Sequence, residues 1–392
     1  MKVDTDRLRV GTNSSVARVA PMKVLFLVQH TEVSPGTRYR VLQYLPALEA
    51  AGLLCTVRVA QSEGSTDAAL GHLSGARHVR TLHWARSWSE THASLARLIS
   101  LLPRFDRCVF YRIPLPAWTT TWLRPYRNRL MYDFDDALDA HEAGETRIMD
   151  RLRGRLWRHS LARAIACCRV IVTSNHRNAA AVAAAGGEAV VIPTSVDVDR
   201  YAFTPRRQTT GRLVLGWIGT PSTAGYLALI EEPLRRILRR YDVELRLVGV
   251  DRSPLGDLRV TVRPWRLETE VDEIAAFDIG LMPMPDTAWT RGKAALKALQ
   301  YGASGAPTVA SWTETNEQIL GRDLGALFCR SAADWDRALG QLIEDQTLRE
   351  QLGRRARDRV AALYSVEANA PKWIALLRDL GQAKVRETDG ER

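Results

Sequence analysis

The chain has 392 residues, a formal net charge of +11 and 46% hydrophobic residues. This length suits about two domains, and the hydrophobic content excludes a chain too polar to build packed cores. No run of about eighteen uncharged apolar residues is present, so no membrane-spanning helix is expected. The first twenty residues are polar and lack the apolar stretch of a secretion signal. The 5 cysteines show neither a disulfide framework nor metal-ligand spacing, which favours reduced thiols in a cytoplasmic protein.

Apolar runs alternate with helical periodicities through the first half of the chain. The expected strands cover 23–28, 54–60, 107–113, 129–134, 169–174 and 189–193. The expected helices cover 88–102, 146–166 and 176–185, and an earlier helix ends at Gly52. Strands that alternate with helices predict a mostly parallel, doubly wound sheet.

The alternation stops at the polar segment 199–211 and then restarts. The second set of expected strands covers 213–218, 243–249, 259–263, 278–282 and 307–311, with helices at 225–240 and 268–276. The tail from 332 onward is helical by its leucine spacing. The same architecture therefore occurs twice, without an internal sequence repeat.

The positive charge indicates an anionic partner: a nucleic acid, an anionic lipid surface or a phosphorylated substrate. Four arginines fall on one side of the predicted helix 146–166, next to an apolar face: Arg147, Arg151, Arg155 and Arg158. Such a helix could lie on an anionic membrane, or it could be a solvated helix that packs its apolar face into the core. A second arginine cluster lies at 235–240. Nucleic acid is disfavoured, because the basic residues are not interleaved with aromatic ones.

Residues 289–311 are the most informative stretch. An amphipathic helix is expected through Leu296 and Gln300, and it ends at the glycines of 302–305. Lys293 and Lys297 are four apart, so on one helix they would share a face. Paired cations beside a glycine-rich loop suit an anionic ligand such as a diphosphate; the alternative is a solvated helix face.

This stretch resembles the donor-site helix of GT-B glycosyltransferases of the family 4-like group (glycosyl transferases group 1). The matching residues are Gly292, Lys293, Lys297, Leu299, Tyr301, Ala303, Gly305, Pro307, Val309, Ala310 and Ser311. The resemblance implies an α/β fold of the GT-B type, in which two Rossmann-like domains face a cleft and a C-terminal helix crosses back. The expected boundaries are a disordered extension at 1–20, an acceptor domain at 21–199, a donor domain at 200–365, and a helix and tail at 366–392.

The donor segment also departs from the family pattern. Many family 4 enzymes have two glutamates eight apart, and this chain has Gly292 and Gln300 at those positions. Gln300 can still hydrogen-bond a ribose hydroxyl, although the charge is lost. These departures motivate the alternative of a non-catalytic nucleotide-sugar or nucleic-acid binding protein on a degenerate GT-B scaffold.

Two further segments are expected to bind the donor. The loop after strand 213–218 consists of Gly219, Thr220, Pro221, Ser222 and Thr223, which would offer N–H groups and hydroxyls to phosphate oxygens. A plain helix N-cap is the alternative interpretation of this loop. The resemblance implies the donor role, because Gly-x-Pro-Ser-Thr occupies this position in the family. It also places Glu317 beside the donor; as a bare carboxylate, Glu317 would only complement a helix dipole.

The acceptor side is expected in the first domain. Gly36, Arg38 and Arg40 follow the first strand, where ligands of α/β sheets usually bind. Arg112 follows strand 107–111 and could contact the transferred sugar or a phosphate. Asp135 could orient an acceptor hydroxyl or accept its proton, or it could cap a helix.

Asp133 and Asp135 also form an Asp-x-Asp, which binds a divalent metal in the other major glycosyltransferase fold, GT-A. The two α/β halves and the donor segment disfavour that interpretation. The sequence therefore predicts a metal-independent glycosyltransferase, with no cofactor beyond its nucleotide-diphosphate-sugar co-substrate. The resemblance implies retention of the anomeric configuration.

The expected catalytic residues are Asp135 and Arg112. The acceptor would be a saccharide or a lipid-linked saccharide, in the synthesis of a cell-envelope polysaccharide or glycolipid. We expect a cytoplasmic protein with peripheral contact at the inner face of an anionic membrane.

Overall fold

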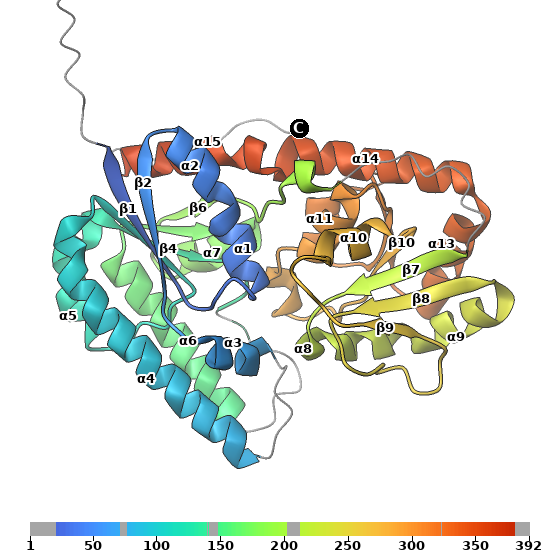
Figure 1. The fold of residues 1–392 in the computed structure, drawn as a ribbon, viewed down its shortest axis with the longest axis horizontal. Coiled ribbons are helices and arrows are strands. Elements are labelled where there is room, and N and C mark those ends of the chain that lie inside the picture. Colours follow the sequence, from blue (N-terminus) through green and yellow to red (C-terminus); the bar gives the residue numbers. More distant parts are fainter. Residues whose placement is uncertain are drawn as a thin grey trace, which may run out of the picture.

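The structure is a computed structural model that describes residues 21–70, 77–138, 140, 148–201, 212–322 and 324–380. The expected extension at 1–20, the linker positions 202–211 and Arg147 lie outside the described residues, as does the side chain of Arg151. Two lobes, each built on one sheet, stand side by side (Figure 1). None of the described helices combines the length and the apolar character that crossing a bilayer would need.

The N-terminal domain contains a six-stranded sheet in the order β2-β1-β3-β4-β5-β6. The strands are β1 (Met22–Val28), β2 (Leu53–Val59), β3 (Arg107–Tyr111), β4 (Leu130–Phe134), β5 (Val170–Thr173) and β6 (Ala189–Val191). Every neighbouring pair is parallel. The central strands are almost wholly apolar and buried, as is expected where helices cover both faces of a sheet.

The C-terminal domain contains a second six-stranded sheet in the order β12-β11-β10-β7-β8-β9. Its strands are β7 (Leu213–Ile218), β8 (Val243–Val248), β9 (Thr261–Arg263), β10 (Ile279–Met282), β11 (Thr308–Ser311) and β12 (Ala326–Cys329). All pairs are again parallel. The prediction of two doubly wound α/β halves is therefore confirmed.

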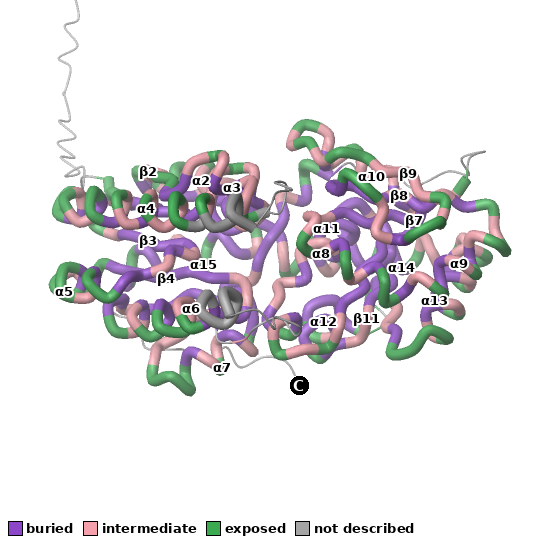
Figure 2. The backbone as a smooth tube through the Cα atoms, turned by 90° about the horizontal axis from the view of Figure 1, so that it is seen from below, coloured by how far each residue is buried: buried purple, intermediate pink, exposed green. Residues whose placement is uncertain are grey.

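Two helical layers cover the N-terminal sheet. One face packs against α4 (Arg77–Leu101), α5 (Thr119–Leu123) and α6 (Ile148–Cys167) through side chains such as Leu98, Leu123 and Leu161. The opposite face packs against α2 (Leu45–Ala50) and α15 (Val366–Asp379), where Leu48 and Trp373 are buried. Figure 2 shows the buried strands between these more exposed layers.

In the C-terminal domain, α9 (Glu231–Arg240) and α13 (Ala332–Glu344) cover one face of the sheet. The opposite face carries α10 (Glu270–Ala275), α11 (Leu296–Ala303) and α14 (Gln346–Tyr364). The chain then returns: α14 leads into α15, which packs on the N-terminal domain (Figure 1). A parallel bridge between Val196 and Ser365 joins the outgoing and returning segments.

Candidate active site

The two domains touch at Gly292, which ends the short helix η6 (Thr290–Gly292). Its carbonyl oxygen accepts hydrogen bonds of 2.9 Å from the side-chain amides of Asn175 and Asn178 in the other domain. A Cβ atom at Gly292 would lie only 2.4 Å from the Cβ of Ala137. This close approach gives a physical reason for glycine at a position where many family 4 enzymes have glutamate.

Lys297 lies against the predicted donor loop. Its Nζ is 3.4 Å from the Thr223 hydroxyl and 5.4 Å from the ring centroid of Trp217. A Cβ at Gly219 would come within 2.8 Å of Lys297 Cε, so only glycine lets the ammonium stem pass so closely. The loop begins at the end of β7 and enters α8 (Pro221–Ala224), with Thr220 at the N-cap position. The structure thus brings the predicted lysine and the predicted loop together.

The expectation that Lys293 and Lys297 lie on one helix is wrong. Lys293 has extended backbone angles, Ala295 is left-handed with φ of 52°, and α11 begins only at Leu296. Lys293 Nζ instead lies 4.9 Å from the ring centroid of Trp289 and 3.3 Å from a carboxylate oxygen of Asp136. The two ammonium groups nevertheless lie near one another. Burial, helped by the neighbouring charge of Lys293, lowers the pKa of Lys297 to about 8.

The N-terminal domain places the carboxylates of Asp135 and Asp136 near these lysines, and Asp136 forms an ion pair with Lys293. Arg112 donates to Asp136 at 2.7 Å and to Asp135 at 3.3 Å, and the Tyr111 hydroxyl donates to Asp135 at 2.9 Å. Burial alone would raise the pKa of Asp136, but Lys293 and Arg112 bring it down to about 2. Arg112 has a left-handed backbone with φ of 53°, an uncommon conformation for a side chain of this size. The predicted catalytic residues Asp135 and Arg112 therefore form one charged cluster with Asp136, Lys293 and Lys297 across the domain interface.

Asp133 and Asp135, the two carboxylates of the Asp-x-Asp, have different partners. Asp133 is fully buried and accepts both guanidinium bonds of Arg40, at 3.1 and 2.5 Å. Asp135 accepts from Tyr111 and Arg112. Because their bonds are made to separate groups, the two side chains do not converge as a metal-binding pair.

The prediction that Arg40 contacts an acceptor is wrong. Its side chain has no exposed surface, and its third guanidinium nitrogen, Nη1, donates to the Ile192 carbonyl at 2.6 Å. Burial raises the pKa of Asp133 to about 6, although Arg40 opposes that shift. Arg40 therefore has a structural role, because it supplies the counter-charge of a carboxylate inside the core.

Arg38 is also buried, at the interface between the domains. It donates to the carbonyls of Glu32 and Val33, forms an ion pair of 3.0 Å with Glu270, and stacks on Trp265 at 4.7 Å. An acceptor could reach this guanidinium only after those contacts open. Gly36, two residues earlier in α1 (Pro35–Arg40), packs so closely that a Cβ would overlap the Tyr111 hydroxyl.

Gln300 faces the first domain in this structure. Its amide donates to the Tyr39 hydroxyl at 2.8 Å, to the Tyr201 hydroxyl at 3.4 Å and to Glu270 at 3.4 Å. Tyr39 in turn donates to Glu270 at 3.2 Å. Sequence reasoning missed Glu270, Tyr39 and Tyr201. The one feature of the sequence that could have pointed to this contact is the acidic Glu270 near the start of the expected helix 268–276.

Glu317, the last predicted donor residue, lies on α12 (Glu314–Leu320) and pairs with Arg322. Its carboxylate therefore serves a surface ion pair in this structure. The bond from Arg322 lowers the pKa of Glu317, and burial opposes that shift only in part.

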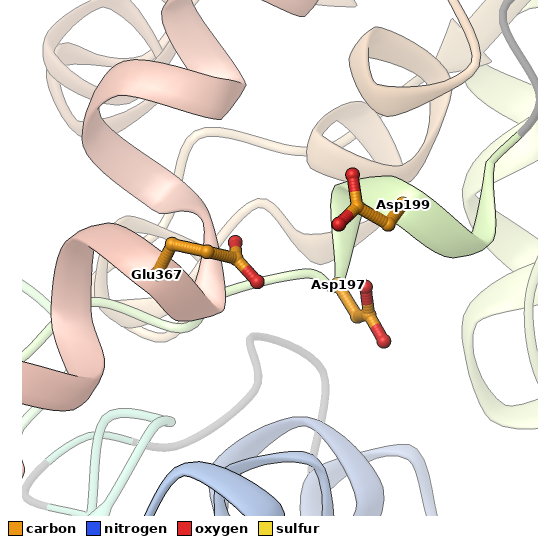
Figure 3. Close-up of side chains that lie close together, drawn as sticks. All are labelled: Asp197, Asp199 and Glu367. Carbon is orange, nitrogen blue, oxygen red and sulfur yellow. The ribbon is translucent and has the colours of Figure 1, made fainter.

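One group of three carboxylates in the described residues has ligand spacing for a metal: Asp197, Asp199 and Glu367 (Figure 3). Asp197 and Asp199 precede the linker, and Glu367 lies in the first turn of α15. Asp199 and Glu367 are exposed, and exposed acidic groups of this kind are common without an ion. The group lies on the connection between domains and shares no residue with the charged cluster around Lys293 and Lys297.

Comparison with known proteins agrees with this architecture. Residues 231–375, which include Lys293 and Lys297, match a family model described as glycosyl transferase-like. No curated protein matches the chain. The fold is similar to a sucrose-phosphate synthase from Thermosynechococcus elongatus, with a TM-score of 0.64 and 17% identity over 93% of this chain and 100% of that one.

Two further solved structures share the fold. HepE of Anabaena in complex with UDP-glucose has a TM-score of 0.59 and 15% identity, over 92% of this chain and 100% of HepE. A glycosyltransferase from Rickettsia africae has a TM-score of 0.64 and 12% identity, over 93% of this chain and 100% of that one. The chain therefore has the fold of these GT-B glycosyltransferases, and its residues 231–375 match a glycosyl transferase-like model. These comparisons do not single out family 4 among the proteins of this fold.

Proposed function

We propose that this chain transfers a sugar from a nucleotide-diphosphate donor to a saccharide or lipid-linked acceptor, without a metal and with retention of configuration. The observation that carries the proposal is the position of Lys297. Its half-buried ammonium lies between Thr223 and Trp217, with a second lysine close by and a pKa lowered to about 8. An anionic group bound there would offset the cost of holding two ammonium charges together.

The chemistry follows from where negative charge develops. In the transfer, the bond between the anomeric carbon and the diphosphate oxygen breaks, and a bond to the acceptor oxygen forms. The acceptor proton passes to an oxygen of the leaving diphosphate. Lys293, Lys297 and the N–H groups and hydroxyls of 219–223 would stabilise that leaving group, which is the largest contribution in chemistry of this type. A divalent cation is then not required.

The acceptor would bind on the N-terminal side of the interface, near Asp135 and Arg112. Their proximity to Lys293 through Asp136 supports this assignment. Arg38 could join them only after its contact with Glu270 opens. A role in cell-envelope polysaccharide or glycolipid synthesis, and a cytoplasmic site of action, are further parts of the proposal.

Uridine nucleotides are the first donors to test. HepE forms a complex with UDP-glucose, and a second similar protein, an α-glucosyltransferase, forms one with UDP and DNA. The assay measures release of nucleoside diphosphate from a panel of nucleotide-sugars, with and without EDTA. Turnover that survives EDTA and is lost in Lys297→Met supports the proposal.

The alternative of a non-catalytic binding protein gives a different result in the same assay. It predicts tight nucleotide-sugar binding with no release of nucleoside diphosphate. Unchanged turnover in Lys297→Met, or complete inhibition by EDTA that Mg²⁺ reverses, would contradict the proposed mechanism.

A further inference from the structure

An outer edge of the N-terminal domain carries two exposed tryptophans. Trp118 precedes α5 and Trp122 lies within it, with 37% and 58% of their surface exposed. They are four residues apart and so project from one side of the helix. Among the described tryptophan side chains, only these two are exposed. Figure 1 places α5 at the end of the molecule farthest from the second domain.

Arginines lie on the segments next to these tryptophans. The segment η3 (Arg124–Arg129) follows α5 directly, and α6 packs beside both. Three arginines lie close enough to affect the Cys167 thiol: burial raises the pKa of Cys167, whereas Arg124, Arg127 and Arg163 each oppose that rise. Arg163 is fixed by a hydrogen bond of 2.8 Å to the Leu115 carbonyl. We call Trp118, Trp122, Arg124, Arg127 and Arg163 the tryptophan–arginine edge.

The segments that build this edge contain no acidic residue. Neither 115–130 nor 154–167 includes an Asp or a Glu, whereas arginine stands at positions 124, 127, 129, 155, 158 and 163. The other arginine cluster of the chain provides the contrast. On α9, Arg235 pairs with Asp257, Arg236 with Asp336 and Arg240 with Glu344.

We propose that the tryptophan–arginine edge docks the protein on an anionic lipid bilayer. Indole rings favour the boundary between headgroups and acyl chains, and arginines around them attract acidic headgroups. The expected membrane contact thus moves from the predicted arginine stripe of 146–166 to α5, η3 and the neighbouring end of α6. The inference does not depend on sugar transfer, because it concerns a surface outside the charged cluster around Lys293 and Lys297.

The test is flotation of the full chain with vesicles of phosphatidylcholine, with and without phosphatidylglycerol. Binding is expected only with phosphatidylglycerol, and it should weaken as salt is added. Arg124→Gln and Arg127→Gln should each lower vesicle affinity about fivefold, the factor that corresponds to ~1 kcal/mol per arginine near the surface. Trp122→Ala should lower it by a similar factor, because the indole is lost.

Matched controls come from the C-terminal domain. Arg236→Gln removes an equal charge from the paired cluster, and Leu229→Ala shortens a side chain that is 54% exposed. Both should bind vesicles like the wild type, and thermal unfolding checks that every variant is folded. The proposal is overturned if pure phosphatidylcholine binds equally well, if the edge variants bind like the controls, or if they lose affinity for a single-stranded oligonucleotide while vesicles do not bind.

Discussion

The carboxylate of Asp136 in the N-terminal domain lies 3.3 Å from the ammonium of Lys293 in the C-terminal domain. Each side chain is about one-fifth exposed, at 19% and 20%. The same lysine is proposed to hold the donor diphosphate. Asp136 and the diphosphate would therefore compete for one cation, and donor binding would exchange an ion pair between domains for one with the ligand.

This competition predicts the effect of Asp136→Asn. The variant keeps the shape of the side chain but removes its charge, so Lys293 becomes available to the ligand. Affinity for the nucleoside diphosphate should rise about fivefold, which corresponds to ~1 kcal/mol, because the ligand no longer has to displace a carboxylate from Lys293. Isothermal titration calorimetry measures the change.

The control is Asp286→Asn, which breaks the more exposed pair with Arg291. It should leave the affinity unchanged. If Asp136→Asn instead weakens binding, Asp136 positions Lys293 for the ligand, and the exchange of partners does not take place.

The lowered pKa of Lys297 predicts proton uptake on donor binding. Free Lys297 has a pKa of about 8, so at that pH only about half of the molecules carry the charge. A bound diphosphate favours the charged form and raises the pKa, so binding draws protons from the buffer. Affinity should accordingly fall as the pH rises above about 8.

Calorimetry at that pH, in two buffers with different ionisation enthalpies, measures the protons taken up. Lys297→Met should remove the uptake as well as most of the affinity. Equal binding enthalpies in both buffers for the wild type would show that Lys297 does not titrate with the ligand.

The sheets were predictable because buried parallel strands appear as short apolar runs, such as 23–28 and 213–218. The local geometry of the donor segment was not. Helical spacing placed Lys293 on a helix, but the left-handed turn at Ala295 carries no sequence signal, since alanine is a good helix former.

Hydrogen-bond partners across the domain interface could not be predicted from the sequence either. Gln300 and Tyr39 are 261 positions apart and meet only once both domains are folded. Arg40 has the residue type of an anion-binding side chain, yet its position at the end of α1 places it against Asp133 in β4. A charged residue near a strand end is compatible with either role, and only the packing decides between them.

The close approach at Gly292 predicts that this position resists substitution. In Gly292→Ala the new Cβ would press on Ala137, including its backbone atoms at 2.9 Å. The domains would have to separate, which weakens the bonds from Asn175 and Asn178. We expect a loss of about 1–3 kcal/mol in the free energy of unfolding, as for other overpacked sites.

Urea unfolding measures that loss. Gly225→Ala is the matched control, because a Cβ there would meet nothing within 4 Å. The control should be neutral or slightly stabilising. If Gly292→Ala is as stable as Gly225→Ala, the contact between the domains is looser than the structure has it.

The buried pair of Arg40 and Asp133 predicts a large effect on stability and a partial rescue. Arg40→Met leaves a carboxylate inside the core without its counter-charge, which should cost about 3–5 kcal/mol. Adding Asp133→Leu removes the unpaired charge and should recover most of that loss.

Arg86→Met is the control, because it breaks an exposed pair with Glu90 that contributes about 0.5 kcal/mol or less. The free energy of unfolding in urea gives all three values. If the double variant is as unstable as Arg40→Met, Arg40 stabilises the domain mainly through its bond to the Ile192 carbonyl and not by neutralising Asp133.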